Sequence, residues 1–123
     1  MKVERTLDTG TQDYTRVNVL DKPGAGGACH EYEVLAVKQR NGYSEKFANV
    51  SFQNGPIKEN RVHGCHQEDL LVIVIDRLRS FQAGAYKCRE NAFALTKIEE
   101  ALHWLRSRTE DRLKRGVEGT SKE

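Results

Sequence analysis

Polar and apolar residues alternate with period two in three stretches of the first half of the chain. These stretches are residues 14–20, 31–37 and 46–52, and such alternation is typical of strands with one buried face. A glycine-rich break over residues 22–27 separates the first two, and Asn41-Gly42 separates the second and third, where both residues tolerate a positive φ. The pattern predicts an antiparallel sheet of about three strands within about residues 14–53, whose apolar face needs a partner surface.

From about Gln67 the apolar residues recur at helical spacing instead. Leu70, Val74 and Leu78 follow one another four residues apart, and Gly84 is expected to stop this first helix. A second helix fits residues 89–114, with Gly116 just past its end. The short connection between them predicts an antiparallel helical hairpin over about residues 67–115.

The apolar residues of this hairpin are more numerous than one packed pair of helices needs. Residues 70–75 are apolar on every side of the first helix, whereas a packed hairpin buries one stripe on each helix. The surplus predicts self-association. The positions expected in the core are Leu71, Ile75, Leu95, Ile98 and Leu102.

Length and composition place these elements in one α+β domain spanning residues 1–123. The chain is 37% hydrophobic and 31% charged, which suits a single compact domain. Its longest apolar run is far shorter than the roughly 18 residues of a membrane span, and its first residues lack an apolar signal segment, so we expect a cytoplasmic protein. Three cysteines without a secretory signal are expected to be free thiols.

Charge is uneven along the chain although the net charge is only +2. Residues 106–115 hold five cations against two acids, a local excess of positive charge that leaves room for an anion site. This basic segment leaves open the alternative of a small nucleic-acid-binding protein, although the total charge does not demand nucleic acid.

Motifs for catalysis are absent from the sequence. No Walker-type phosphate loop, no Gly-x-Ser-x-Gly elbow and no His-Glu-x-x-His helix occurs. A nucleotide hydrolase using His63, His66 and Glu68 remains an alternative.

A zinc site is the metal candidate that the sequence offers. The residues that could build it are Cys29, His30, His63, Cys65 and His66. Their spacing is irregular and lacks a Cys-x-x-Cys knuckle, so we expect no metal and no cofactor.

Polar and aromatic residues gather around the predicted link between the helices. Arginine binds phosphate through a planar fork, an aromatic ring stacks on a base, and an amide pairs with a base edge. The alternative is an ordinary surface on which Arg77 and Arg89 pair with Asp76 and Glu90 while Phe81 caps the core. The residues of this group are Arg77, Arg79, Phe81, Arg89, Glu90 and Asn91.

Ten segments together resemble the phage Thoeris anti-defence sponge family over about residues 30–120. The helical hairpin also resembles the smaller phage anti-CBASS sponge, which lacks the N-terminal sheet. The segments are VSFQNGPIKE at 50–59, EDL at 68–70, IVIDRL at 73–78, FQ at 81–82, CREN at 88–91, LTKIEEA at 95–101, WL at 104–105, RT at 108–109, DR at 111–112 and RGVEGT at 115–120.

The resemblance implies a phage protein in the cytoplasm of the infected bacterial host. Such a protein sequesters, without degrading it, a cyclic ADP-ribose isomer made by a TIR-domain enzyme, so that the downstream effector is not activated. The family also implies a homo-oligomer, either a dimer or a hexamer built from dimers, with separate sites for cyclic oligonucleotides of the CBASS type.

Matching positions imply which residues bind the ligand. Phe81 would stack on adenine, Asn91 would hydrogen-bond the ligand and Arg108 would hold phosphate. Further candidates are Arg89, Lys58 and Arg112. Because Arg108 lies 17 positions beyond Asn91, roughly 25 Å along a straight helix, we expect the site to straddle two antiparallel chains.

Overall fold

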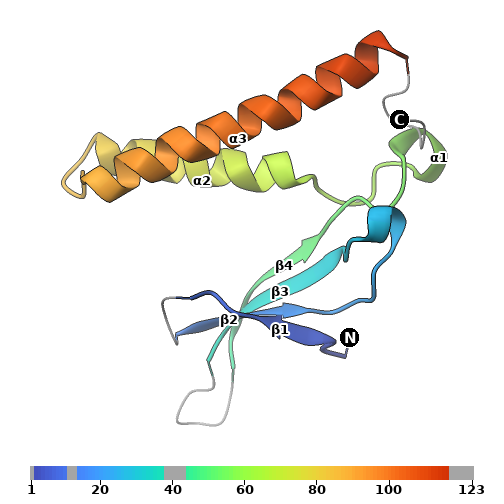
Figure 1. Ribbon diagram of the computed structural model, residues 1–123. Helices are drawn as coiled ribbons and strands as arrows, with labels where there is room; N and C mark the ends of the chain where they lie inside the picture. The colour runs from blue at the N-terminus through green and yellow to red at the C-terminus, as the bar shows by residue number, and fades with distance from the viewer. Residues whose placement is uncertain (1, 11–13, 38–43, 117–123) are drawn as a thin grey trace. The chain divides into compact units, whose positions relative to one another are not determined.

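The computed structural model describes residues 2–10, 14–37 and 44–116, and it divides into two compact units, residues 1–65 and 66–123. The first unit is an antiparallel sheet and the second is a helical hairpin (Figure 1), so the predicted α+β class is confirmed. In the part of the chain that the structure describes, no helix is both long and apolar enough to cross a membrane.

The sheet has four strands in the order β1-β2-β3-β4, one more than the sequence predicts. β2 (Thr15–Val19), β3 (Glu31–Ala36) and β4 (Lys46–Ser51) fall within the predicted stretches. The added strand, β1 (Arg5–Leu7), pairs antiparallel with β2. Its three residues are too few for an alternating pattern, so pairing with β2 rather than local sequence defines it. The predicted turn at Asn41-Gly42 lies outside the described residues.

A chain of polar side chains crosses all four strands of the sheet. Thr6 Oγ1 donates a hydrogen bond of 2.8 Å to Asn18 Oδ1, and Asn18 Nδ2 donates one of 2.8 Å to Glu33 Oε2. Lys46 Nζ then pairs with Glu33 Oε1 at 3.0 Å. The hydrogen bond from Asn18 and the pairing with Lys46 lower the pKa of Glu33 below its ordinary value of 4.5. Asn18 and Glu33 are both buried, so their mutual bond satisfies groups that would otherwise be costly to bury.

The connections within the first unit are fixed by short helical turns and one close approach. The glycine-rich break forms a 3₁₀ turn at Ala25–Gly27, with φ of 73° at Gly26 and 79° at Gly27. Past β4, the single-turn helix α1 (Ile57–Asn60) leads to a parallel bridge between Phe52 and Cys65. A Cβ at Gly64 would lie 2.5 Å from the Phe52 carbonyl carbon, so the bridge needs glycine at this position.

The hairpin unit consists of α2 (Gln67–Gln82) and α3 (Arg89–Lys114), which lie side by side and are joined by residues 83–88 (Figure 1). Both helices agree with the predicted ranges. Glu68 and Asp69 occupy the first turn of α2, where the helix dipole favours acids, and Asp69 Oδ2 accepts the His66 N–H at 2.9 Å. Ile75 and Leu102 are buried, as predicted, while Leu71, Leu95 and Ile98 are half-buried.

Large apolar side chains are exposed on both helices of the hairpin. On α2 these are Val72, Ile73 and Val74, and on α3 they are Phe93, Trp104 and Leu113. The apolar run at residues 70–75 therefore does present more than one apolar face, as its sequence predicts.

Candidate functional site

The end of the hairpin where α2 meets the connecting loop gathers aromatic and cationic side chains. The guanidinium carbon of Arg77 lies 5.3 Å from the centroid of the Phe81 ring, one helical turn further along α2. The Tyr86 ring, from the loop, meets Phe81 edge to face, with centroids 6.0 Å apart and planes at 73°. We call these three residues, together with Asn91, the hairpin tip.

Hydrogen bonds hold the loop of the hairpin tip from both sides. Gln82 Oε1, at the end of α2, accepts the Cys88 N–H at 3.0 Å. From α3, Asn91 Nδ2 donates to the Tyr86 carbonyl oxygen at 3.4 Å, and the Asn91 N–H is capped by Cys88 Sγ at 3.4 Å. Tyr86 thus stands on a loop that both helices anchor.

The predicted site residues Phe81 and Asn91 therefore share the hairpin tip. Arg89 lies on the first turn of α3, and its exposed side chain forms a long ion pair of 3.6 Å with Glu90. This pair agrees with the alternative of an ordinary charged surface for Arg89, but Arg77 contacts the Phe81 ring. Cation, aromatic ring and amide are the groups that recognise phosphate and base, so the tip is suited to a nucleotide.

Arg108 is on α3 but far from the tip of its own protomer. α3 is one continuous helix, so the 17 residues between Asn91 and Arg108 span about 25 Å. The Arg108 side chain is exposed. Arg112, one turn further on, is buried and takes part in an interaction. It is therefore not an ordinary solvent-exposed charge. Lys58 is exposed on α1, in the other unit.

Two of the residues named as zinc or acid–base candidates, His63 and Cys29, form hydrogen bonds with neighbouring segments of the first unit, whereas His30 Nδ1 is buried without a partner among the described residues. Asn54 N–H donates to His63 Nε2 at 3.1 Å, and His63 N–H donates to Gln53 Oε1 at 3.0 Å. Cys29 donates its S–H to the Asp21 carbonyl at 3.4 Å. Across residues 2–10, 14–37 and 44–116, no group of three histidine, cysteine or acidic side chains could hold a metal ion.

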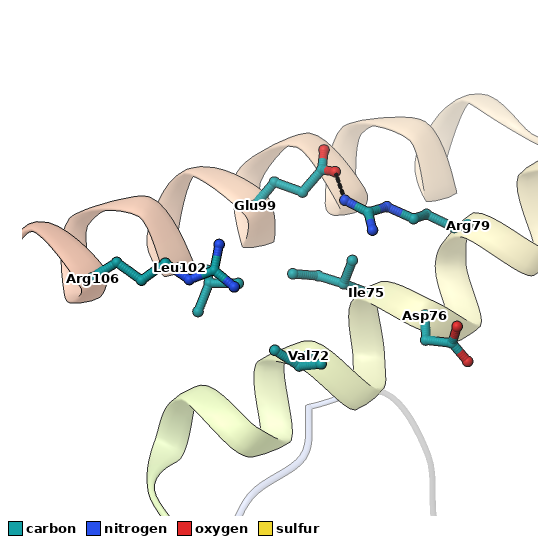
Figure 2. A pocket seen from close by; sticks show the side chains of 7 residues that line it. All are labelled: Val72, Ile75, Asp76, Arg79, Glu99, Leu102 and Arg106. Carbon is teal, nitrogen blue, oxygen red and sulfur yellow. Dashed lines mark hydrogen bonds and ion pairs between the residues drawn. The ribbon is translucent and has the colours of Figure 1, made fainter.

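A groove between α2 and α3, with a volume of about 330 Å³, was not anticipated from the sequence. Its apolar floor is Val72, Ile75 and Leu102, and the Arg79–Glu99 ion pair of 2.7 Å crosses between the helices at one end (Figure 2). A second hollow shares Val72, Leu102 and Arg106 and continues to Thr109. The i, i+3 spacing of Val72 and Ile75 was visible in the sequence, but which face of α3 opposes them was not.

Comparison with known proteins decides what kind of hairpin this is. Residues 45–110, more than half of the chain, match the family model described as the Acb2/Tad1 hairpin domain. The chain belongs to this family. A relative named Thoeris anti-defense 1, from Bacillus phage SBSphiJ7, is 53% identical over 78 residues. The match covers 63% of this chain and 55% of the relative, so it spans about half of the relative's length.

The Acb2/Tad1 hairpin-domain match confirms the family resemblance that the sequence segments indicate. Its boundaries take in β4, all of α2 and most of α3, and thus the whole hairpin tip and Arg108. β1, β2 and β3 precede the match, and Arg112 follows it. The family match therefore includes the hairpin tip and Arg108, but it does not include the first three strands of the sheet.

Tyr86 is the residue of the hairpin tip that the sequence did not reveal. It lies within the hairpin-domain match and is 75% exposed. A loop residue has no helical or strand period, so pattern alone cannot mark it. The available signal was a large aromatic residue five positions after Phe81, in a connection too short to bury it.

Proposed function

We propose that this protein binds a cyclic ADP-ribose isomer made by a TIR-domain enzyme and sequesters it without chemical change. The observation that carries the proposal is the hairpin tip of a family hairpin, where Arg77 and Tyr86 contact the Phe81 ring and Asn91 hydrogen-bonds the Tyr86 carbonyl. Support also comes from the relative named for Thoeris anti-defence. By this proposal the protein acts in the cytoplasm of the infected host and removes the signal before an effector senses it.

In the proposed site Phe81 stacks on adenine, Asn91 hydrogen-bonds the ligand and Arg108 holds phosphate. Arg89, Lys58 and Arg112 are secondary candidates for phosphate contacts. The separation of about 25 Å between Asn91 and Arg108 along α3 means that Arg108 must come from a second protomer. The proposed site is therefore complete only in a homo-oligomer, a dimer or a hexamer built from dimers, and CBASS cyclic oligonucleotides would occupy separate sites.

The exposed apolar side chains of α2 and α3 support assembly of this kind. Exposed apolar side chains such as Ile73 on α2 and Trp104 on α3 are unfavourably hydrated, and burial against a second hairpin would remove them from water. Antiparallel packing of two hairpins would bring the basic end of one α3 beside the hairpin tip of the other. Neither protomer would bind the ligand fully alone.

Sequestration sets a requirement on affinity. At a submicromolar signal concentration the dissociation constant must be nanomolar or lower, which corresponds to roughly −12 kcal/mol. Stacking on Phe81 and charge-assisted phosphate contacts in an enclosed site supply contributions of this kind. No step of bond making or breaking is needed.

The test is calorimetric titration of the purified protein with a cyclic ADP-ribose isomer, followed by heating and chromatography of the released ligand. We expect nanomolar binding and recovery of the intact ligand. Recovery of a converted product would replace the proposal with a hydrolase, for which His63, His66 and Glu68 were the sequence candidates. Absence of binding, together with salt-sensitive binding of DNA or RNA, would favour the nucleic-acid alternative.

A further inference from the structure

Tyr86 is a large exposed ring held in a defined place. Its ring is 75% exposed yet lies 6.0 Å from the Phe81 centroid in an edge-to-face contact. The hydrogen bond from Asn91 Nδ2 fixes its backbone carbonyl, and the bond between Gln82 and Cys88 closes the loop behind it. The aromatic ring is therefore presented to solvent by a loop that is ordered before any ligand arrives, which lowers the entropic cost of a contact with a ligand.

The geometry around Phe81 limits where a base can stack. The guanidinium of Arg77 covers one face of the Phe81 ring at 5.3 Å. A base must then use the other face, with its plane about 3.5 Å from the ring, the usual separation of carbon atoms in contact. The Tyr86 centroid is 6.0 Å from that of Phe81, so a fused two-ring base stacked on the free face would reach Tyr86 if the tyrosine borders that face.

We propose that Tyr86 is a second ligand contact and that Phe81 and Tyr86 together form an aromatic corner that receives the purine base. This inference rests on the proposed function, since it concerns the same ligand at the same end of the hairpin. The corner contacts the base on its face through Phe81 and at its edge through Tyr86, an arrangement that aromatic groups favour. A purine is large enough to contact both the Phe81 ring and the Tyr86 ring. A single-ring base stacked on Phe81 would not reach Tyr86.

Two substitutions at Tyr86 and one matched control test the aromatic corner. Tyr86→Ser removes the ring, Tyr86→Phe keeps it, and Tyr14→Ser removes a tyrosine that is 80% exposed at the start of β2. Each variant is titrated with the cyclic ADP-ribose isomer, and the decrease in adenine absorbance on stacking is recorded. Melting temperature and elution from a sizing column are measured in parallel.

We expect Tyr86→Ser to weaken binding roughly tenfold to 100-fold, the range of base–aromatic contacts, and to reduce the absorbance change. Tyr86→Phe should bind within about twofold of wild type, and Tyr14→Ser should bind like wild type, because the contact is made by the ring. The melting temperature and the oligomer should be unaltered in all three. Equal loss in Tyr86→Phe and Tyr86→Ser would overturn the aromatic corner.

The outcomes separate this inference from the proposed function. Tight binding by wild type with unchanged binding by Tyr86→Ser overturns the inference and leaves sequestration intact. If wild type does not bind the cyclic isomer, the same variants are titrated with linear ADP-ribose. The expected order of affinities with that probe would support the aromatic corner while the proposed function fails, and no binding of either probe overturns both.

Discussion

The sheet unit and the hairpin unit satisfy their buried groups in different ways. In the sheet, Asn18 and Glu33 are buried and hydrogen-bonded to each other, and Thr6 and Lys46 complete the chain on either side. In the described part of the hairpin the buried side chains are Ile75, Leu102 and Arg112, while six large apolar side chains of the two helices are exposed. In the sheet, polar side chains thus hydrogen-bond to one another across the strands, although His30 Nδ1 is buried without a partner in the part of the chain that the structure describes, whereas the helices of the hairpin expose apolar side chains.

Because the two units differ in this way, substitutions in the sheet and in the hairpin should have different effects. Changes in the sheet should alter its stability without altering the chemistry of the hairpin tip. Changes on the hairpin surface should alter assembly and binding while leaving the fold of one protomer intact. Each prediction below sets a change in one unit against a control in the other unit or on the same helix.

The largest effect is expected from a charge in the exposed apolar surface of α2. Ile73 is 57% exposed, so Ile73→Asp should leave the helix content unaltered but dissociate the proposed homo-oligomer, in which the aspartate would be buried without a partner. Sizing chromatography with light scattering would report the mass. Val62→Asp, at an exposed position of the other unit, is the control, and an unchanged mass for Ile73→Asp would contradict self-association through α2.

The second-largest effect is expected from removal of the proposed phosphate contact of Arg108. Arg108→Ala should weaken binding of the cyclic ADP-ribose isomer by about 1.5–3 kcal/mol, the typical worth of a hydrogen bond to a charged group. Calorimetry would measure this change, and the melting temperature should stay constant because Arg108 is exposed in the protomer. Lys97→Ala, an exposed cation on the same helix, should have no effect. Equal affinities of Arg108→Ala and wild type would remove Arg108 from the site.

In the sheet, Glu33→Ala should cost about 1–3 kcal/mol of local stability, because it leaves the buried Asn18 amide without its acceptor. Hydrogen exchange of the backbone amides of β2 and β3 would report the loss, while amides of α3 should exchange as in wild type. The matched variant is Glu45→Ala, which removes an exposed carboxylate from the same unit. Faster exchange spread equally over both units would show that the units do not unfold independently.

A weaker and graded effect is expected from pH. The folded sheet holds the pKa of Glu33 below its ordinary value of 4.5, so this carboxylate stabilises the sheet fully at pH values above that ordinary pKa. The contribution is lost as the pH falls from there through the lowered folded pKa. Exchange of β3 amides measured over this acidic range should show the loss, and Glu33→Gln should flatten it. A slope as steep in Glu33→Gln as in wild type would assign the acid sensitivity to another group.

The smallest effect is expected from the ion pair that crosses the hairpin. Arg79 and Glu99 bond at 2.7 Å, but their side chains are 63% and 40% exposed, so solvent screens the interaction. A double-mutant cycle with Arg79→Ala and Glu99→Ala should give a coupling of about 0.2–1 kcal/mol that declines with added salt. A larger, salt-insensitive coupling would indicate that this end of the groove is covered in the assembly.

The elements of regular period could be predicted from the sequence, and the remaining ones could not. α2 and α3 agree because helical spacing, first-turn acids and a glycine past the end are local signals. β1 depends on β2 for its definition, and α1 is a single turn after Pro56, so neither carries a period of its own. The parallel bridge at Cys65 joins residues 13 positions apart without any repeating pattern.

The candidate site could be predicted in part for the same reason. The short link between the helices places Phe81 near Asn91, so their proximity follows from the hairpin alone. The position of Arg108 follows from helix length. The contact of Tyr86 with Phe81 depends on how the loop turns, and the burial of Arg112 depends on an interaction that its neighbours in sequence do not reveal.

The six-residue loop that joins α2 and α3 also has a consequence for the order of folding. Hydrogen bonds inside α2 and α3 join residues four positions apart and the loop between the helices is short, whereas each link of the polar chain in the sheet joins residues 12 to 15 positions apart. Low contact order speeds folding, so we expect the hairpin to form before the sheet in refolding. Trp104 is the chain's single tryptophan and reports α3 by fluorescence. A tryptophan signal slower than protection of the β3 amides would reverse this order.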